Sequence, residues 1–277
     1  MLLMPLFVGC SAVRLTYNQG PFLAYWWLDG YADFNAEQAP RVKAALEAWF
    51  AWHRSTQLAD YAQALADLQA LADDSLSAAQ VCQQVQAWQQ RAERAFEQAL
   101  PAIADHVRTL SAVQLRHIER QQAKKQADAE ADYLQDDADA RRKASLKRSV
   151  DRAESLYGSL TAPQRQMVAA ELAHSPFKPE LWLAERRQRQ QDILRHLQQW
   201  SAERTDTAVV QVGLRQLGLA ALASPRPGYQ AYADAVAQAN CALSAKLHNS
   251  SSPAQRQHAV AKLKGWEDDL RALMARR

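Results

Sequence analysis

Residues 160–164 read Leu160-Thr161-Ala162-Pro163-Gln164, and this pattern, Leu-Ser/Thr-x-x-Gln, decides the expected fold. It recurs at two further places, and its last four positions recur at a third: 76–80, 110–114 and 252–255. In such a capping box the Ser or Thr side chain accepts a hydrogen bond from a backbone N–H of the first helical turn, and the Gln side chain reaches back to the cap N–H. Each occurrence therefore predicts the start of a helix. Asn35 with Gln38 is a fifth, weaker example.

Apolar residues recur at helical spacing between these starts. The stripes fall in eight segments: 42–53, 58–68, 81–103, 146–157, 193–200, 209–222, 229–243 and 260–273. Spacings of three and four place such residues on one face of a helix. Gly and Pro are few, at 8 and 10 in 277 residues. We therefore predict an all-α fold, a multi-helix bundle of about eight or nine amphipathic helices, with 209–222 as the most buried.

The first eleven residues carry a different signal. Phe7-Val8-Gly9-Cys10 ends a short apolar run and has the form of a lipobox, in which the cysteine is acylated and becomes the new N-terminus. We predict that residues 1–9 are a short or truncated signal peptide, since no Lys or Arg precedes Arg14 to form a basic n-region. The alternative is a buried apolar segment in which Cys10 is incidental.

Acylation of Cys10 would fix where the protein works, because two or more lipid chains anchor a protein stably. Ser11 follows the cysteine, and a residue other than Asp at this position favours the outer membrane over the inner one. We expect a lipid-anchored, periplasm-facing protein of the outer membrane, with the membrane and envelope proteins as partners. The charge balance of 33 basic and 30 acidic residues indicates no nucleic-acid partner.

Aromatic residues concentrate just after this segment, in 25–34 and 49–54. Eight residues form a possible functional or structural cluster: Trp26, Trp27, Asp29, Tyr31, Asp33, Trp52, His53 and Arg54. We favour a structural interpretation, a core helix, because aromatic residues at helical spacing are usually core. A charge in such a cluster is costly unless paired, so we expect Asp29 or Asp33 to meet His53 or Arg54. The alternative is a groove or acid site lined by the same residues.

These segments resemble a known family. Proteobacterial lipoproteins grouped as domain of unknown function 6279 begin with the same order of motifs: a lipobox, Arg-Leu-x-Tyr-Asn (here 14–18), Trp-Trp-Leu-Asp-x-Tyr-x-Asp (26–33) and a Trp-His-Arg helix end (52–54). The Leu-Thr-x-x-Gln box at 160–164 and the stretch 181–187 also fit, so the resemblance extends over the whole chain. It implies a lipid-anchored helical protein, and it implies no activity.

The chain divides into three expected parts. Residues 1–9 are the signal segment, 10–34 the lipidated N-terminus and aromatic segment, and 35–277 a helical domain. Within that domain, 119–148 has almost no apolar residue, and a helix that is polar all round projects into solvent or packs along one narrow seam. We favour a solvated hairpin or loose linker for this stretch. A partner-binding arm is the alternative.

Signatures of catalysis do not occur in the sequence. It has no Gly-rich phosphate loop, no His-Glu-x-x-His and no Gly-x-Ser-x-Gly, and no two of its seven His residues are four apart. We therefore expect no catalytic residue, no metal site and no cofactor beyond the covalent lipid on Cys10. A two-carboxylate hydrolase that uses Asp29 and Asp33 is the less favoured alternative.

The function we expect is a non-catalytic protein-binding or structural role in the envelope. The alternative is a periplasmic chaperone or envelope-assembly factor, because small periplasmic helical chaperones carry the Leu-Thr-x-x-Gln motif at helix starts. Cys82 and Cys241 could pair in an oxidising compartment. Both lie in helical patterns, where a buried free cysteine acts as a small apolar residue, and we favour free thiols.

Overall fold

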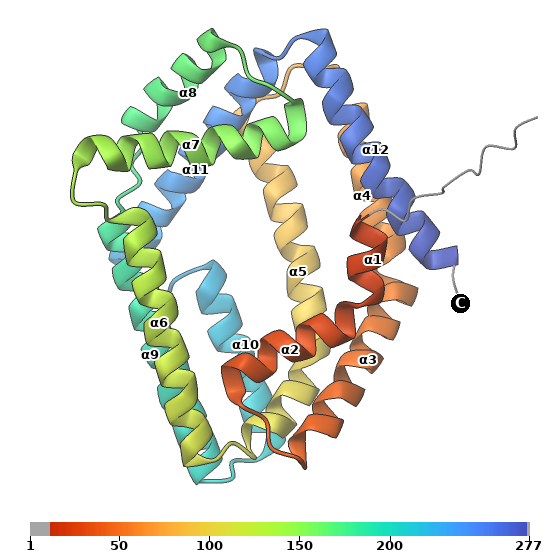
Figure 1. The fold of residues 1–277 in the computed structure, drawn as a ribbon, viewed down its shortest axis with the longest axis vertical. Helices are drawn as coiled ribbons and strands as arrows, with labels where there is room; N and C mark the ends of the chain where they lie inside the picture. Colours follow the sequence, from red (N-terminus) through yellow and green to blue (C-terminus); the bar gives the residue numbers. More distant parts are fainter. Residues whose placement is uncertain (1–11, 276–277) are drawn as a thin grey trace, which may run out of the picture.

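The computed structural model describes residues 12–275, and this part of the chain is helical, with no strand. The helices are α1 (Ala12–Asn18), α2 (Gly20–Ala32), α3 (Gln38–Thr56), α4 (Leu58–Ala70), α5 (Ala78–Val107), α6 (Ala112–Tyr133), α7 (Ala138–Tyr157), α8 (Ala162–Ala173), α9 (Pro179–Ala202), α10 (Thr207–Leu222), α11 (Pro227–Asn249) and α12 (Pro253–Ala275) (Figure 1). The all-α prediction is confirmed. No helix among residues 12–275 is long and apolar enough to cross a membrane.

The predicted number of eight or nine helices is wrong, because the described residues form twelve. The apolar stripes miss α1, whereas the break between α3 and α4 agrees with the separate stripes at 42–53 and 58–68. Helix α1 has 7 residues, too few for a repeating apolar stripe. A single residue, Gln57, separates α3 from α4, and its backbone keeps right-handed helical angles (φ −106°, ψ −32°). The break therefore occurs without a Gly or Pro residue.

The predicted capping boxes are present. At Ser77, Ser111 and Thr161 the side chain accepts from the backbone N–H three residues on, and the Gln side chain accepts from the cap N–H. The boxes at 252–255 and 35–38 show the same two hydrogen bonds. These motifs specify helix starts through contacts within four residues, which explains why the sequence alone locates them.

Four of these boxes also join in pairs, which the sequence does not reveal. Gln164 and Gln255 exchange two amide hydrogen bonds, each of 2.9 Å from Nε2 to Oε1. Gln38 and Gln114 do the same at 3.4 and 2.7 Å. Each amide also donates to a backbone carbonyl two residues before the partner's cap, and all four Gln side chains are buried. The pairs therefore tie the start of α3 to that of α6, and the start of α8 to that of α12.

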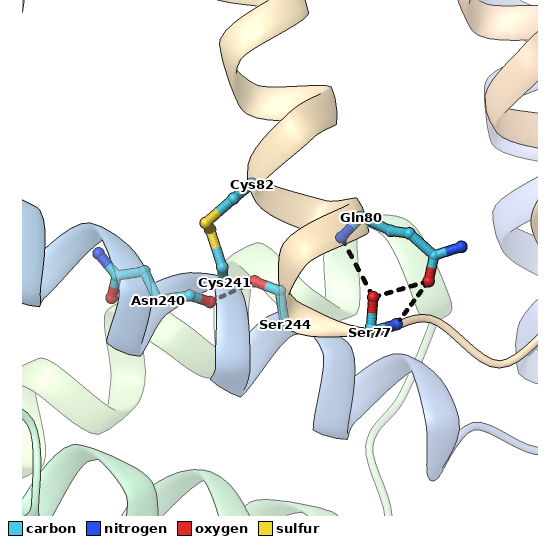
Figure 2. Close-up of a disulfide and its surroundings, with 6 residues drawn as sticks. All are labelled: Ser77, Gln80, Cys82, Asn240, Cys241 and Ser244. Carbon is cyan, nitrogen blue, oxygen red and sulfur yellow. Dashed lines mark hydrogen bonds between the residues drawn. A yellow bond between two sulfur atoms is a disulfide. The ribbon is translucent and has the colours of Figure 1, made fainter.

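A disulfide links Cys82 on α5 to Cys241 on α11, with their Cα atoms 5.5 Å apart (Figure 2). The preference for two free thiols is therefore wrong. The two cysteines are 159 residues apart in sequence, so their proximity depends on how α5 and α11 pack and not on local pattern. The bond lies one turn into α5, just after the Ser77–Gln80 box (Figure 2).

The helices pack along the sides of an elongated frame, with α6 and α9 together on one side and α4 with α12 on the other (Figure 1). Helix α5 runs between them and packs against α10 and α11. Buried apolar residues gather in two clusters. One joins α5, α6, α9 and α10 around Leu100, Ile118 and Val210. The other joins α7, α8 and α11 around Val150 and Val168.

Two expectations about burial need correction. Helix α10, expected to be the most buried, buries only Val210 and Leu214, because it packs on α5 and α9 from one side. Four of its apolar residues are exposed: Val209, Val212, Leu219 and Leu222. The polar stretch 119–148 is helical apart from the turn between α6 and α7, and Gln126 is its one buried residue, which agrees with the solvated interpretation. It is no loose linker, since its first half belongs to α6, which packs along α9.

Candidate functional site

The segment singled out in the sequence forms a small module from α1, α2 and α3. Helix α2 begins at Gly20 with Pro21 in its first turn. A Cβ added at Gly20 would overlap the ring of Phe50 on α3, so a glycine is needed for this close approach. The glycine therefore sets how α2 leaves α1 and crosses the end of α3.

His53 is buried at the centre of this module. Its Nδ1 atom lies 2.8 Å from the Tyr17 hydroxyl, and its ring stacks on Trp49 with 4.8 Å between ring centroids. Trp52 contacts it edge-on at 6.2 Å. Burial lowers the pKa of His53 and raises the pKa of Tyr17 to about 12, with Arg54 opposing the rise. Both side chains are therefore neutral at pH 7, and this pair holds α1 against α3.

Arg54 fixes the same module to the end of the chain. Its Nη2 donates to the side-chain oxygen of Asn18 at 2.9 Å, and its Nη1 donates to the Leu273 carbonyl at 3.3 Å. A second link runs from α1 to α12, where Arg14 and Asp269 form an ion pair of 3.1 Å with both side chains largely buried. The first helix of the described chain is thus held from two sides.

The expected pairing of Asp29 or Asp33 with His53 or Arg54 is wrong. Asp29 accepts hydrogen bonds from the Phe34 N–H at 3.1 Å and from the Tyr25 hydroxyl at 3.3 Å. Asp33 is the C-cap of α2 in left-handed conformation (φ 53°), and it is exposed. The two carboxylates lie in the last turn and C-cap of α2, next to the start of α3, where Gln114 bonds both Gln38 and the Asp33 carbonyl. Arg54 lies in the last turn of α3, at the other end of that helix. The two carboxylates do not form a shared acid site.

The core-helix prediction is also wrong for the two tryptophans. Trp26 and Trp27 expose 69% and 59% of their surface, and Phe22 exposes 65%. Leu23 is exposed as well. Residues 22, 23, 26 and 27 are spaced so that they share one side of a helix; we call this set the aromatic face of α2. Tyr31, by contrast, packs against the core cluster around Leu100.

Phe22 and Leu23 were not among the candidate residues of the sequence. The signal that could have located them is their spacing of four from Trp26 and Trp27. Helix α2 also carries Tyr25, Leu28 and Tyr31, so spacing groups these four residues but does not separate their side of the helix from the side that packs on the protein. Which side of the helix faces the protein is a tertiary property.

Cys10, the predicted lipidation site, lies outside the described residues. Within 12–275 no group of three or more His, Cys, Asp or Glu side chains could hold a metal ion. Residues 30–217 match the model of a protein family described as a family of unknown function (DUF6279). No curated protein and no solved structure matches the chain.

Proposed function

We infer that this chain, which belongs to the family of unknown function DUF6279, is a lipid-anchored protein of the cell envelope that rests its first helices on a membrane and binds other envelope proteins. The observation that carries the inference is the aromatic face of α2. The helix before α2 begins at Ala12, two residues after Cys10. A lipid on Cys10 would therefore hold this face close to the bilayer surface. We place the protein at the periplasmic side of the outer membrane and assign it no catalytic step.

A membrane surface suits these side chains better than water does. Trp has an apolar ring and one polar N–H, and it is enriched where membranes meet water. Contiguous exposed apolar side chains on a protein surface mark an interaction site. Phe22 and Leu23 would enter the acyl region beside Trp26 and Trp27. Such a contact adds to the lipid anchor, since apolar area and acyl chains both contribute to the free energy of membrane binding.

The disulfide supports an extracytoplasmic location. Disulfides persist in oxidising compartments such as the bacterial periplasm and are rare where thiols are kept reduced. Cys82 and Cys241 are bonded, whereas Cys10 would be free for acylation.

The exposed side of α10 supports a protein-binding role. Val209, Val212 and Leu219 follow one another at spacings of three and seven, which places them along one side of the helix. Crosslinking in cells, followed by affinity purification, should recover defined envelope partners. The Val212→Asp variant should lose them, whereas Val113→Asp, which changes an exposed valine on α6, should keep them. Equal recovery with both variants would remove α10 from the proposal.

The anchor itself is tested by labelling cells with a palmitate analogue. The wild-type protein should incorporate the label and sediment with outer-membrane fractions, whereas Cys10→Ala should do neither. Unchanged labelling and fractionation of Cys10→Ala would refute lipidation at this residue. Sedimentation with inner-membrane fractions would contradict the placement in the outer membrane.

A chaperone role is the second candidate, and one observation favours it. An apolar groove of about 450 Å³ lies between α4 and α5, lined by Leu68, Val81, Val85 and Trp88. The Gln side chains of four capping boxes are buried and not accessible to a client protein, so the groove and not those motifs would bind clients. A chaperone should suppress aggregation of unrelated unfolded proteins at near-stoichiometric ratios, and Val85→Asp should abolish this effect.

A further inference from the structure

A second feature of the surface is a cationic cleft on the opposite side of the fold from α1 (Figure 1). It has a volume of about 490 Å³ and lies where α7 meets the end of α6, the start of α9 and the middle of α11 (Figure 1). Four arginines line it: Arg141, Arg142, Arg148 and Arg152. Glu180 is the one acidic residue among the lining residues. The cleft therefore carries an excess of positive charge in a chain whose overall charge is nearly balanced.

One of these arginines, Arg148, is held in place by two contacts. Arg148 donates from Nη1 to the Asp132 carbonyl at 2.9 Å, and its guanidinium lies 4.2 Å from the centre of the Tyr133 ring. That ring packs in turn on Trp182 at 4.8 Å and on Phe177 at 6.1 Å. Contact with an aromatic face holds an arginine in place while its remaining N–H groups stay available. One wall of the cleft is thus aromatic, with a fixed positive charge against it.

The other three arginines are either without an ion-pair partner among the described residues or paired only at the surface. Arg152 is exposed and makes no ion pair with another described residue. Arg141 lies 3.5 Å from Glu180, and Arg142 pairs with Asp139 on its own helix. Ion pairs between exposed side chains contribute little to stability. An anionic ligand can therefore replace these carboxylates at small cost.

We propose that this cleft binds a phosphate monoester whose organic part packs on the aromatic wall. Guanidinium groups donate pairs of parallel hydrogen bonds to phosphate oxygens. Three serine hydroxyls, from Ser145, Ser149 and Ser175, also line the cleft and add donors for a group with several acceptor oxygens. Tyr133 and Phe177 offer apolar surface for the rest of the ligand. This site is independent of the membrane contact proposed for α2.

Isothermal titration of the purified full-length protein with phenyl phosphate, inorganic phosphate and benzoate tests the site. We expect phenyl phosphate to bind more tightly than either of the others, because it alone combines the phosphate with an aromatic ring. Arg152→Gln should weaken binding of phenyl phosphate about tenfold, the usual loss when one charged hydrogen-bond partner is removed. Lys143→Gln is the matched control, since it removes an exposed charge from the same helix outside the cleft.

No binding of phenyl phosphate, equal binding of benzoate, or equal losses in Arg152→Gln and Lys143→Gln would overturn the proposal. Thermal melting of both variants checks the fold, and within residues 12–275 the Arg152 side chain makes no ion pair whose loss would disturb it. Vesicles of phosphatidylcholine with and without phosphatidic acid identify the source of the phosphate. If Arg152→Gln binds the phosphatidic acid vesicles more weakly than the wild type does, the site is supported and its ligand is a lipid headgroup. If vesicle binding is unchanged but phenyl phosphate binding is weaker, the site is supported and its ligand is a soluble ester.

Discussion

The disulfide between Cys82 and Cys241 gives the prediction with the largest magnitude. The bond closes a loop of 159 residues. In the chain-entropy description, a crosslink over a loop of that length removes enough freedom from the unfolded chain to stabilise the fold by about 5 kcal/mol at 25 °C. Measured values are usually lower, at about 2–4 kcal/mol. At about 2–4 °C per kcal/mol for a chain of this size, the double substitution Cys82→Ser with Cys241→Ser should lower the melting temperature by about 10 °C.

Circular dichroism of the oxidised protein, the reduced protein and the double variant measures this shift. The reduced protein and the variant should melt at the same lower temperature, and the helical spectrum at 20 °C should be unchanged, because α5 and α11 also pack through their side chains. A thiol-reactive dye on the unfolded, unreduced protein should leave both cysteines unmodified. Modification of Cys82 and Cys241 by the dye would refute the disulfide. A double variant that melts at the same temperature as the oxidised protein would refute its contribution to stability.

Three further outcomes are expected. Gly213→Ala should lower the free energy of unfolding by about 1–3 kcal/mol, because the new Cβ overlaps the Trp200 ring. A Cβ at Gly265 meets open space in the interior of its helix, so Gly265→Ala should be neutral or stabilising by up to about 1 kcal/mol. Equal urea midpoints for the two variants would contradict this pair of predictions. Gln164→Ala removes both amide hydrogen bonds to the buried Gln255 and the one to the Ser250 carbonyl. It should cost about 1–3 kcal/mol in the same assay, so an unchanged midpoint would show that the pair is dispensable. Burial lowers the pKa of His53 in the folded protein. Its contribution to stability is therefore complete above the unfolded pKa of about 6.5 and is lost as the pH falls below that value. His53→Gln should reduce the loss of unfolding free energy with falling pH in urea titrations, and an unchanged loss would assign it to other groups.

Local signals in the sequence specify much of the fold. The Thr161 and Ser111 boxes locate helix starts because their hydrogen bonds close within one turn. The pairing of Gln164 with Gln255 requires two boxes to meet across 91 residues, and no local rule contains that information. The same limit explains Cys82, whose partner is set by the packing of α5 on α11.

The candidate site shows that a sequence does not assign which side of a helix is buried and which is exposed. The sequence places Trp26 and Trp27 in one aromatic cluster, but whether they lie in the core or at the surface depends on the position of α3. The close approach of Gly20 to Phe50 turns the other side of α2 towards α3 and leaves both tryptophans exposed. The sequence predicts that Asp29 or Asp33 pairs with His53 or Arg54. Asp29 instead accepts from backbone and hydroxyl donors at the end of its own helix, which satisfy a carboxylate equally well.

Contact between the aromatic face of α2 and a lipid bilayer is the central claim, and fluorescence quenching by brominated phosphatidylcholine tests it most directly. The anchored wild-type protein is reconstituted into brominated and unbrominated vesicles and compared with the variant Trp26→Leu/Trp27→Leu, which keeps the apolar surface. We expect bromine to quench part of the wild-type emission, and we expect this quenched part to be absent from the variant. Equal quenching of the two proteins, or none of either, would contradict the claim that α2 lies in the membrane surface.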